Sequence, residues 1–138
     1  MIEIKDYSGF SGIPLNVFSP TSPSDLISFL KTNKKSKFRI GAGLSGVSGA
    51  AVPKKNELYI DLSSFKSLHW IDESEGVFSS AAGNSMREIK DFVEAKGWDF
   101  PVLPGSLDIA TLGGMIACNG GGPYSLKYGK INRFIRGI

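Results

Sequence analysis

Residues 37–46 read Lys-Phe-Arg-Ile-Gly-Ala-Gly-Leu-Ser-Gly, a short strand-like run that passes directly into a glycine cluster. The second half matches the G-x-G-x-x-G pattern of dinucleotide-binding βαβ units, and Asp61 lies where a ribose-binding acid is expected, about 20 residues on. The two parallel strands of such a unit need a crossover of roughly a dozen residues or more, usually a helix. Here only residues 47–56 precede the next predicted strand, and they include Gly49, Pro53 and mostly small side chains. We therefore predict an irregular loop instead of a βαβ unit.

This first glycine cluster has the composition of an anion-binding loop. Successive backbone N–H groups in an irregular turn form a concave site for phosphate oxygens, and glycine lets the backbone approach them closely. Ser45 and Ser48 add hydroxyl donors. The sequence has no Gly-Lys-Ser/Thr ending, so a P-loop is not supported. A tight turn without any ligand is the alternative.

A second glycine cluster follows in the last third of the chain. It comprises Pro101-Val-Leu-Pro-Gly-Ser106, Thr111-Leu-Gly-Gly-Met-Ile-Ala-Cys-Asn-Gly-Gly-Gly122 and Leu126-Lys-Tyr-Gly129. The pair Gly113-Gly114 opens an apolar stretch, as expected where the first turn of a helix lies against a ligand and its amides favour negative charge. Asn119 can donate and accept hydrogen bonds in this loop. Packing in a core is the alternative role for residues 115–117 and Tyr128.

Composition restricts the function classes. The chain has 138 residues, of which 41% are hydrophobic and 21% charged, as in one globular domain. A formal charge of +3 is too small for a nucleic-acid-binding stripe. One cysteine and one histidine, Cys118 and His69, exclude an intrachain disulfide and a Cys-rich metal site. No apolar run has the length of a signal peptide or membrane span, so we expect a cytoplasmic protein.

Patterns outside the clusters predict mixed α and β structure. Ser22 and Pro23 fit the start of a helix, and Ser85 with Glu88 fits a capping box. The segment Glu57–Leu62 alternates with period two, as a half-buried strand does. The expected strands cover residues 15–18, 37–40, 57–62, 69–71 and 77–82, the last two joined as a hairpin, and the expected helices cover about 23–33 and 85–96.

The two clusters, in this order, resemble those of the FAD-linked oxidase family, whose flavin domain is of the vanillyl-alcohol-oxidase or p-cresol-methylhydroxylase (PCMH) type. The resemblance covers residues 20–138. Residues 113–122 with Leu126-Lys-Tyr-Gly129 look most like the glycolate oxidase flavoprotein subunit and FAD-dependent D-lactate dehydrogenases. The implied fold is α+β: the N-terminal subdomain of a PCMH-type FAD-binding domain, with a small β-sheet flanked by helices, plus the start of the second subdomain.

The resemblance implies FAD as the cofactor and two groups of contacting residues. The first group would hold the diphosphate: Gly41, Ala42, Gly43, Leu44, Ser45, Gly46 and Gly49. The second group would follow the cofactor toward the flavin ring and line the rest of its groove: Pro104, Gly105, Ser106, Thr111, Gly113, Gly114, Ala117, Asn119, Gly122, Tyr128 and Gly129. The first loop is one residue longer than is usual in the family, at Leu44-Ser45. Tyr124 stands where some relatives carry a histidine, which implies non-covalent FAD.

The activity implied by the resemblance is oxidation of a small 2-hydroxy acid, of the glycolate or D-lactate type, by hydride transfer to flavin N5. Residues 1–138 would form only the N-terminal part of the flavin domain. The remainder of that domain and a substrate cap would come from partner chains, or the chain would be a fragment that self-associates. No catalytic residue and no metal ligand are therefore assigned, and the chain alone is expected to be inactive. The alternatives are a non-catalytic nucleotide-binding or assembly subunit and a flavin domain like that of UDP-N-acetylenolpyruvoylglucosamine reductase.

Overall fold

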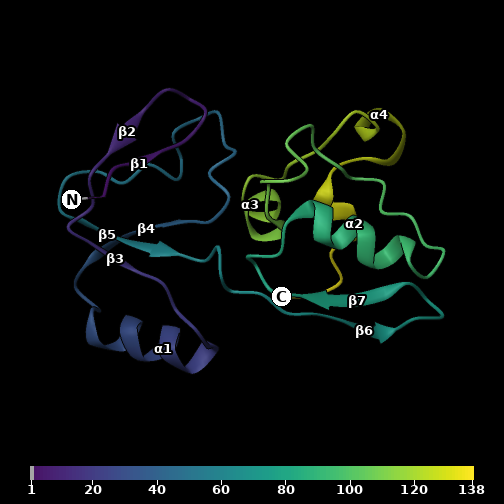
Figure 1. The fold of residues 1–138 in the computed structure, drawn as a ribbon, viewed down its shortest axis with the longest axis horizontal. Coiled ribbons are helices and arrows are strands. Elements are labelled where there is room, and N and C mark those ends of the chain that lie inside the picture. The colour runs from purple at the N-terminus through teal and green to yellow at the C-terminus, as the bar shows by residue number, and fades with distance from the viewer. Residues whose placement is uncertain (1) are drawn as a thin grey trace. The chain divides into compact units, whose positions relative to one another are not determined.

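The computed structural model describes residues 2–138, which form two compact units that divide after Phe65 (Figure 1). The first unit contains strands β1 to β5 and helix α1, and the second contains strands β6 and β7 and the remaining helices. Each glycine cluster belongs to a different unit.

The main sheet of the first unit has three parallel strands in the order β3-β5-β4. They are β3 (Asn16–Phe18), β4 (Lys37–Gly41) and β5 (Glu57–Asp61). Two further strands, β1 (Ile4–Lys5) and β2 (Ser11–Gly12), form a short antiparallel pair. This pair was not predicted, because strands of two residues are too short to show a period.

The helix α1 (Pro23–Thr32) begins where it was predicted. The Ser22 side chain accepts a hydrogen bond from the Asp25 N–H, and Pro23 occupies the first turn, where its missing N–H costs nothing. The ring of Phe29 stacks on that of Phe18 in β3, with 3.9 Å between centroids. The apolar side chains of α1 are only partly covered, since no residue of α1 is fully buried and Ile27 is 51% exposed.

The strand predicted at residues 57–62 is present as β5, but the prediction that it is half-buried was wrong. The strand β5 is central in its sheet, and its residues 57–60 are all buried. Glu57 and Tyr59 alternate with the apolar side chains of β5, but both are buried within the first unit. The Glu57 carboxylate pairs with Arg39, and the Tyr59 hydroxyl occupies the space that a side chain at Gly41 would need.

The connection between the neighbouring parallel strands β4 and β5 is an irregular loop, residues 42–56, without a helix. The rejection of a βαβ unit is therefore confirmed. Near its end the loop is fixed by the Lys54 N–H, which donates to the Glu57 carboxylate at 2.8 Å. Arg39 in β4 adds a bond from Nη1 to the Ala50 carbonyl at 3.0 Å.

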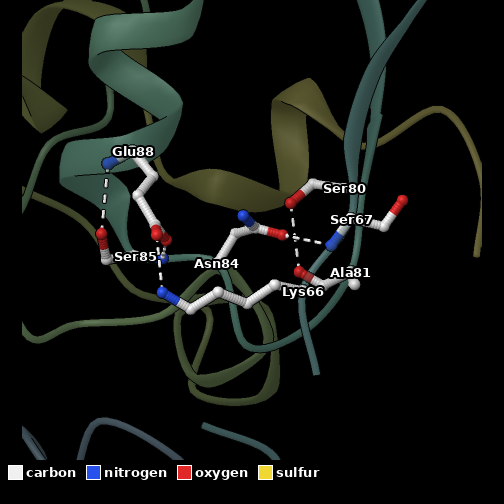
Figure 2. Close-up of polar contacts among 7 residues, drawn as sticks. All are labelled: Lys66, Ser67, Ser80, Ala81, Asn84, Ser85 and Glu88. Carbon is white, nitrogen blue, oxygen red and sulfur yellow. Dashed lines mark hydrogen bonds and ion pairs between the residues drawn. The ribbon is translucent and has the colours of Figure 1, made fainter. Parts of the chain in front are cut away.

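The second unit starts with the predicted hairpin of β6 (Leu68–Asp72) and β7 (Val77–Ser80). It continues with α2 (Met86–Glu94), α3 (Leu112–Ala117), α4 (Ser125–Tyr128) and the 3₁₀ turn η1 (Ile131–Phe134). The predicted capping box of α2 is present, with Ser85 and Glu88 each accepting from the other's backbone (Figure 2). The core of this unit consists of Met86, Ile89, Val93, Phe100, Val102, Ala110, Leu112, Met115 and Ile131.

Candidate functional site

The first predicted group of site residues lies at the carboxyl end of a parallel strand. Gly41 is the last residue of β4, and the chain then stays irregular through Gly49. Within residues 41–49, two backbone conformations are left-handed, those of Leu44 with φ 52° and Gly49 with φ 73°. Such a conformation is uncommon for a residue other than glycine, so Leu44 marks a sharp local turn.

The backbone amides of this loop are largely unused by the protein. Within residues 2–138, the N–H groups of residues 42–48 have no hydrogen-bond acceptor. Residues 42–45 are half-buried and residues 46–48 exposed, and the whole run carries no charged side chain. Unpaired amides in a turn of this kind are donors for an anion. The geometry therefore fits the predicted anion-binding loop.

A buried carboxylate fixes the far end of the loop. Asp6, 5% exposed, accepts hydrogen bonds from the Gly49 N–H at 3.0 Å and the Ser8 N–H at 2.9 Å, and also from the Ser8 hydroxyl. These bonds, the Ser8 hydroxyl first, hold the pKa of the Asp6 carboxyl below its usual value. Asp6 is thus ionised at neutral pH, and its charge opposes an anion that the amides would attract.

The near end of the loop rests on a tyrosine. A Cβ atom built on Gly41 would lie 2.0 Å from the Tyr59 hydroxyl oxygen, so only glycine fits there. Tyr59 is 2% exposed, and its hydroxyl has no hydrogen-bond partner within residues 2–138. Burial, and secondarily the charge of Asp61, raises the pKa of Tyr59 to about 12. The hydroxyl therefore stays protonated and is a donor without an acceptor.

The second predicted group lies in the second unit, around two short helices. The loop before α3 contains Pro104, Gly105 and Ser106. The helix α3 has Thr111 as its N-cap and contains Gly113, Gly114 and Ala117, and it is followed by Asn119 and Gly122. The helix α4 ends at Tyr128, with Gly129 as its C-cap. The two groups occupy different units, and their predicted meeting around one ligand stays a prediction.

The first amides of α3 do not have the predicted role. The Leu112 N–H donates to the Asn84 carbonyl at 2.9 Å, and the Gly113 N–H to the Ala82 carbonyl at 3.0 Å. The Gly114 N–H is directed at the Thr111 hydroxyl at 3.4 Å. The prediction that these amides are free to face an anion was wrong, because the segment before α2 accepts from the first two and the Thr111 side chain accepts from the third.

Close backbone packing explains several glycines of this group. A Cβ atom on Gly113 would lie 2.7 Å from the Ala82 Cβ, and one on Gly122 would lie 1.9 Å from the Leu103 carbonyl oxygen. Gly129 has φ 91°, which disfavours any other residue. Gly105 differs, since a Cβ atom there would have no neighbour within 4 Å. Most of these glycines thus allow contacts inside the unit, and Gly105 remains open.

Sequence reasoning missed the segment that positions α3. Asn84 is 5% exposed, and its side-chain oxygen accepts from the Ser67 N–H at 3.0 Å (Figure 2). The backbone carbonyl of Asn84 accepts from the Leu112 N–H at the start of α3. Lys66 pairs with Glu88 in the capping box at 2.5 Å in the same view. The run Ala81-Ala82-Gly83-Asn84 was the available signal, since small residues before a capped helix permit close contact.

Residues 2–138 contain neither a candidate metal cluster nor a helix that could span a membrane. No group of three or more His, Cys, Asp or Glu side chains converges there on a possible metal position. In the same part of the chain, every helix falls short of the length and apolar character needed to cross a bilayer.

The comparisons with known proteins agree on one protein family. A family model described as an FAD binding domain matches residues 14–138. A D-lactate dehydrogenase from Archaeoglobus fulgidus is 34% identical over 122 residues, covering 86% of this chain and 27% of that protein. A probable D-2-hydroxyglutarate dehydrogenase from Oryza sativa subsp. indica is 26% identical over 132 residues, covering 96% of this chain and 23% of that protein. The chain therefore spans about a quarter of the length of the curated relatives it matches.

A solved structure shares the fold. The alkyldihydroxyacetonephosphate synthase structure superposes with a TM-score of 0.75 at 24% sequence identity, covering 85% of this chain and 23% of that one. At this identity the likeness shows the fold alone. The predicted α+β fold of this type is confirmed.

Proposed function

Because this chain belongs to the FAD binding domain family and FAD is its cofactor, we propose that it forms the diphosphate-binding part of a flavin-dependent oxidoreductase that oxidises a 2-hydroxy acid. Its relatives named D-lactate dehydrogenase and D-2-hydroxyglutarate dehydrogenase support this class of substrate. The resemblance of residues 113–129 to the glycolate oxidase flavoprotein subunit and FAD-dependent D-lactate dehydrogenases favours a small acid of the glycolate or D-lactate type.

The observation that carries the proposal is the run of unpaired amides at residues 42–48. In open parallel sheets, ligands bind beyond the carboxyl ends of the strands, and this run directly follows β4. The Ser45 and Ser48 hydroxyls add donors, and no acidic side chain lies within the run. The donor set therefore suits a diphosphate, and the amides must outweigh the opposing charge of Asp6.

The second group would contact the rest of the cofactor by a different means. Since the first amides of α3 are already used, we assign this group to van der Waals packing and side-chain hydrogen bonds. Gly105 has open space where a ligand would approach. Asn119 is exposed and has φ 46°, with its amide side chain available for hydrogen bonding.

When bound, FAD would supply the redox chemistry, a two-electron oxidation of the hydroxy acid by hydride transfer from C2 to flavin N5. The residues of this chain hold the diphosphate and thereby orient the ring system. We place the base, the clamp for the substrate carboxylate and the substrate cap outside residues 1–138, on partner chains or on further sequence. We expect no histidyl–flavin bond through this chain, and thus non-covalent FAD, because the single histidine, His69, lies outside both glycine clusters.

The direct test is to purify the native protein, with any chain that accompanies it, and to record its absorbance spectrum and native mass. We expect bound FAD, a companion that completes the enzyme, and reduction of an electron-accepting dye by glycolate or D-lactate. Binding of adenine nucleotides without preference for flavin, together with no dye reduction, would favour the non-catalytic subunit instead. Cell fractionation checks the cytoplasmic location that we propose for it.

A matched pair of variants tests the loop itself. Ser45→Asp puts a negative charge among the free amides and should weaken FAD binding by roughly 10-fold or more. Ser24→Asp makes the same change in the exposed first turn of α1, where a negative charge is favourable, and should bind FAD normally. Equal affinities of the two variants would contradict a diphosphate at residues 42–48.

A further inference from the structure

One side chain beneath the candidate loop has an unexplained polar atom. The Tyr59 hydroxyl is fully covered, and within residues 2–138 nothing bonds to it. A buried donor without an acceptor is costly, so such groups are rare in native proteins. Tyr59 is also the residue whose hydroxyl excludes a side chain at Gly41, where the loop begins.

The position of this hydroxyl directs it toward the loop. The ideal Cβ position of Gly41 is 2.0 Å from the hydroxyl oxygen and 3.4 Å from the Leu44 Cδ2 atom. The oxygen therefore lies against the first residues of the segment whose amides are free. A phenylalanine would fill the same core without an unpaired polar group, so packing alone does not account for the hydroxyl.

We propose that the Tyr59 hydroxyl donates a hydrogen bond to the diphosphate that the loop Gly41–Gly49 binds, an inference that rests on the proposed function. Tyr59 would then add a side-chain donor from β5 to the amide donors of residues 42–48. Because the hydroxyl is covered in this structure, the contact requires residues 42–44 to shift when the ligand binds. Within residues 2–138, the backbone N–H and C=O groups of residues 42–45 make no hydrogen bonds, so this short stretch can move between Gly41, whose carbonyl accepts from the Leu62 N–H, and Gly46, whose carbonyl accepts from the Tyr7 N–H.

Nearby charges make a protonated donor the only useful form of this group. Asp61 on the same strand raises the pKa of Tyr59, which reaches about 12 mainly through burial. A phenolate would repel both Asp61 and a diphosphate. The hydroxyl keeps its proton at physiological pH. Its contribution to ligand binding should therefore not change between about pH 6 and 9, since this whole range lies well below the pKa of Tyr59.

The test compares Tyr59→Phe with the native protein, stripped of FAD and titrated with FAD, ADP and adenosine. Loss of a hydrogen bond to a charged group should weaken FAD and ADP binding by roughly 10-fold to 100-fold. Adenosine has no diphosphate, and its affinity should stay the same. Tyr7→Phe is the matched control, because the Tyr7 side chain is 71% exposed, and it should bind all three ligands normally.

The midpoint of thermal unfolding without ligand is the second readout. Removing an unpaired buried hydroxyl should leave the Tyr59→Phe midpoint unchanged or raise it, whereas a lower midpoint would reveal a partner inside the protein and overturn the inference. Unchanged FAD affinity, or an equal loss for adenosine, would also overturn it while leaving the diphosphate loop in place. If the native protein itself binds no FAD, the proposed function fails.

Discussion

The guanidinium of Arg39 makes two hydrogen bonds to the carboxylate of Glu57, from Nε at 3.1 Å and from Nη2 at 3.2 Å. This pair joins β4 to β5 across the sheet from which the candidate loop emerges. The same two side chains hold the end of the connecting loop, through Ala50 and Lys54. The ion pair therefore fixes the second part of the loop between β4 and β5, the loop whose first part carries the free amides.

Glu57→Gln should destabilise the first unit. The substitution keeps the shape but removes the charge that accepts from Arg39 and from the Lys54 N–H. Because Glu57 is 8% exposed, the loss should be about 1–3 kcal/mol in the free energy of unfolding. Chemical denaturation measures it, and Glu3→Gln, at an exposed position, is the control that should change nothing. Equal stability of the two variants would contradict this role.

The same carboxylate makes stability depend on acid. Hydrogen bonds from the Lys54 N–H and then from Arg39 lower the pKa of Glu57 below its usual 4.5. The ionised Glu57 carboxylate therefore contributes its full stabilisation above about pH 4.5. This contribution is lost as the pH falls through the lower pKa that Glu57 has in the folded state. Between pH 5 and 3, roughly that window, Glu57→Gln should lose less stability than the native protein. Parallel losses in both proteins would contradict the assignment.

Gly41→Ala should destabilise the protein because its methyl group would meet the Tyr59 hydroxyl. We expect about 1–3 kcal/mol, the usual range for overpacking. Part of the clash disappears with the hydroxyl, so the same substitution should cost less in a Tyr59→Phe background. A double-mutant cycle on unfolding free energies measures this coupling, and strictly additive effects would show that the two residues do not meet.

Two adjacent glycines of α3 should respond differently to alanine. Gly113→Ala places a methyl group 2.7 Å from the Ala82 Cβ and should destabilise the second unit by about 1–3 kcal/mol. Gly114→Ala meets only the Thr111 hydroxyl, at 3.4 Å, and should be neutral or stabilising by up to about 1 kcal/mol, since alanine favours helix. Thermal unfolding of both variants decides this. A destabilised Gly114→Ala beside a normal Gly113→Ala would contradict the packing described for α3.

Local signals in the sequence predicted much of the fold. The starts of α1 and α2 were visible because Ser22 and Ser85 are caps whose partners lie within the next three residues. The β6–β7 hairpin was visible because its two strands are joined by a short connection and lie next to each other in the sequence. The absence of a helix between β4 and β5 followed from the composition of residues 47–56.

The remaining features depend on contacts between distant residues. The full burial of β5 could not be seen, because it requires Arg39 and Gly41 to accommodate Glu57 and Tyr59. The use of the α3 amides depends on Ala82 and Asn84, about thirty residues earlier in the chain, and no local pattern announces such pairs. For the candidate site, the sequence predicted the loop and its glycines, but not the unpaired Tyr59 hydroxyl beneath them.

The central claim is that the amides of residues 42–48 bind the FAD diphosphate. Hydrogen exchange of these amides, measured on the native protein with and without FAD, tests it most directly. We predict slower exchange at residues 42–48 when FAD is bound, with no change in α1. Exchange in this loop that is unaffected by bound FAD would contradict the account.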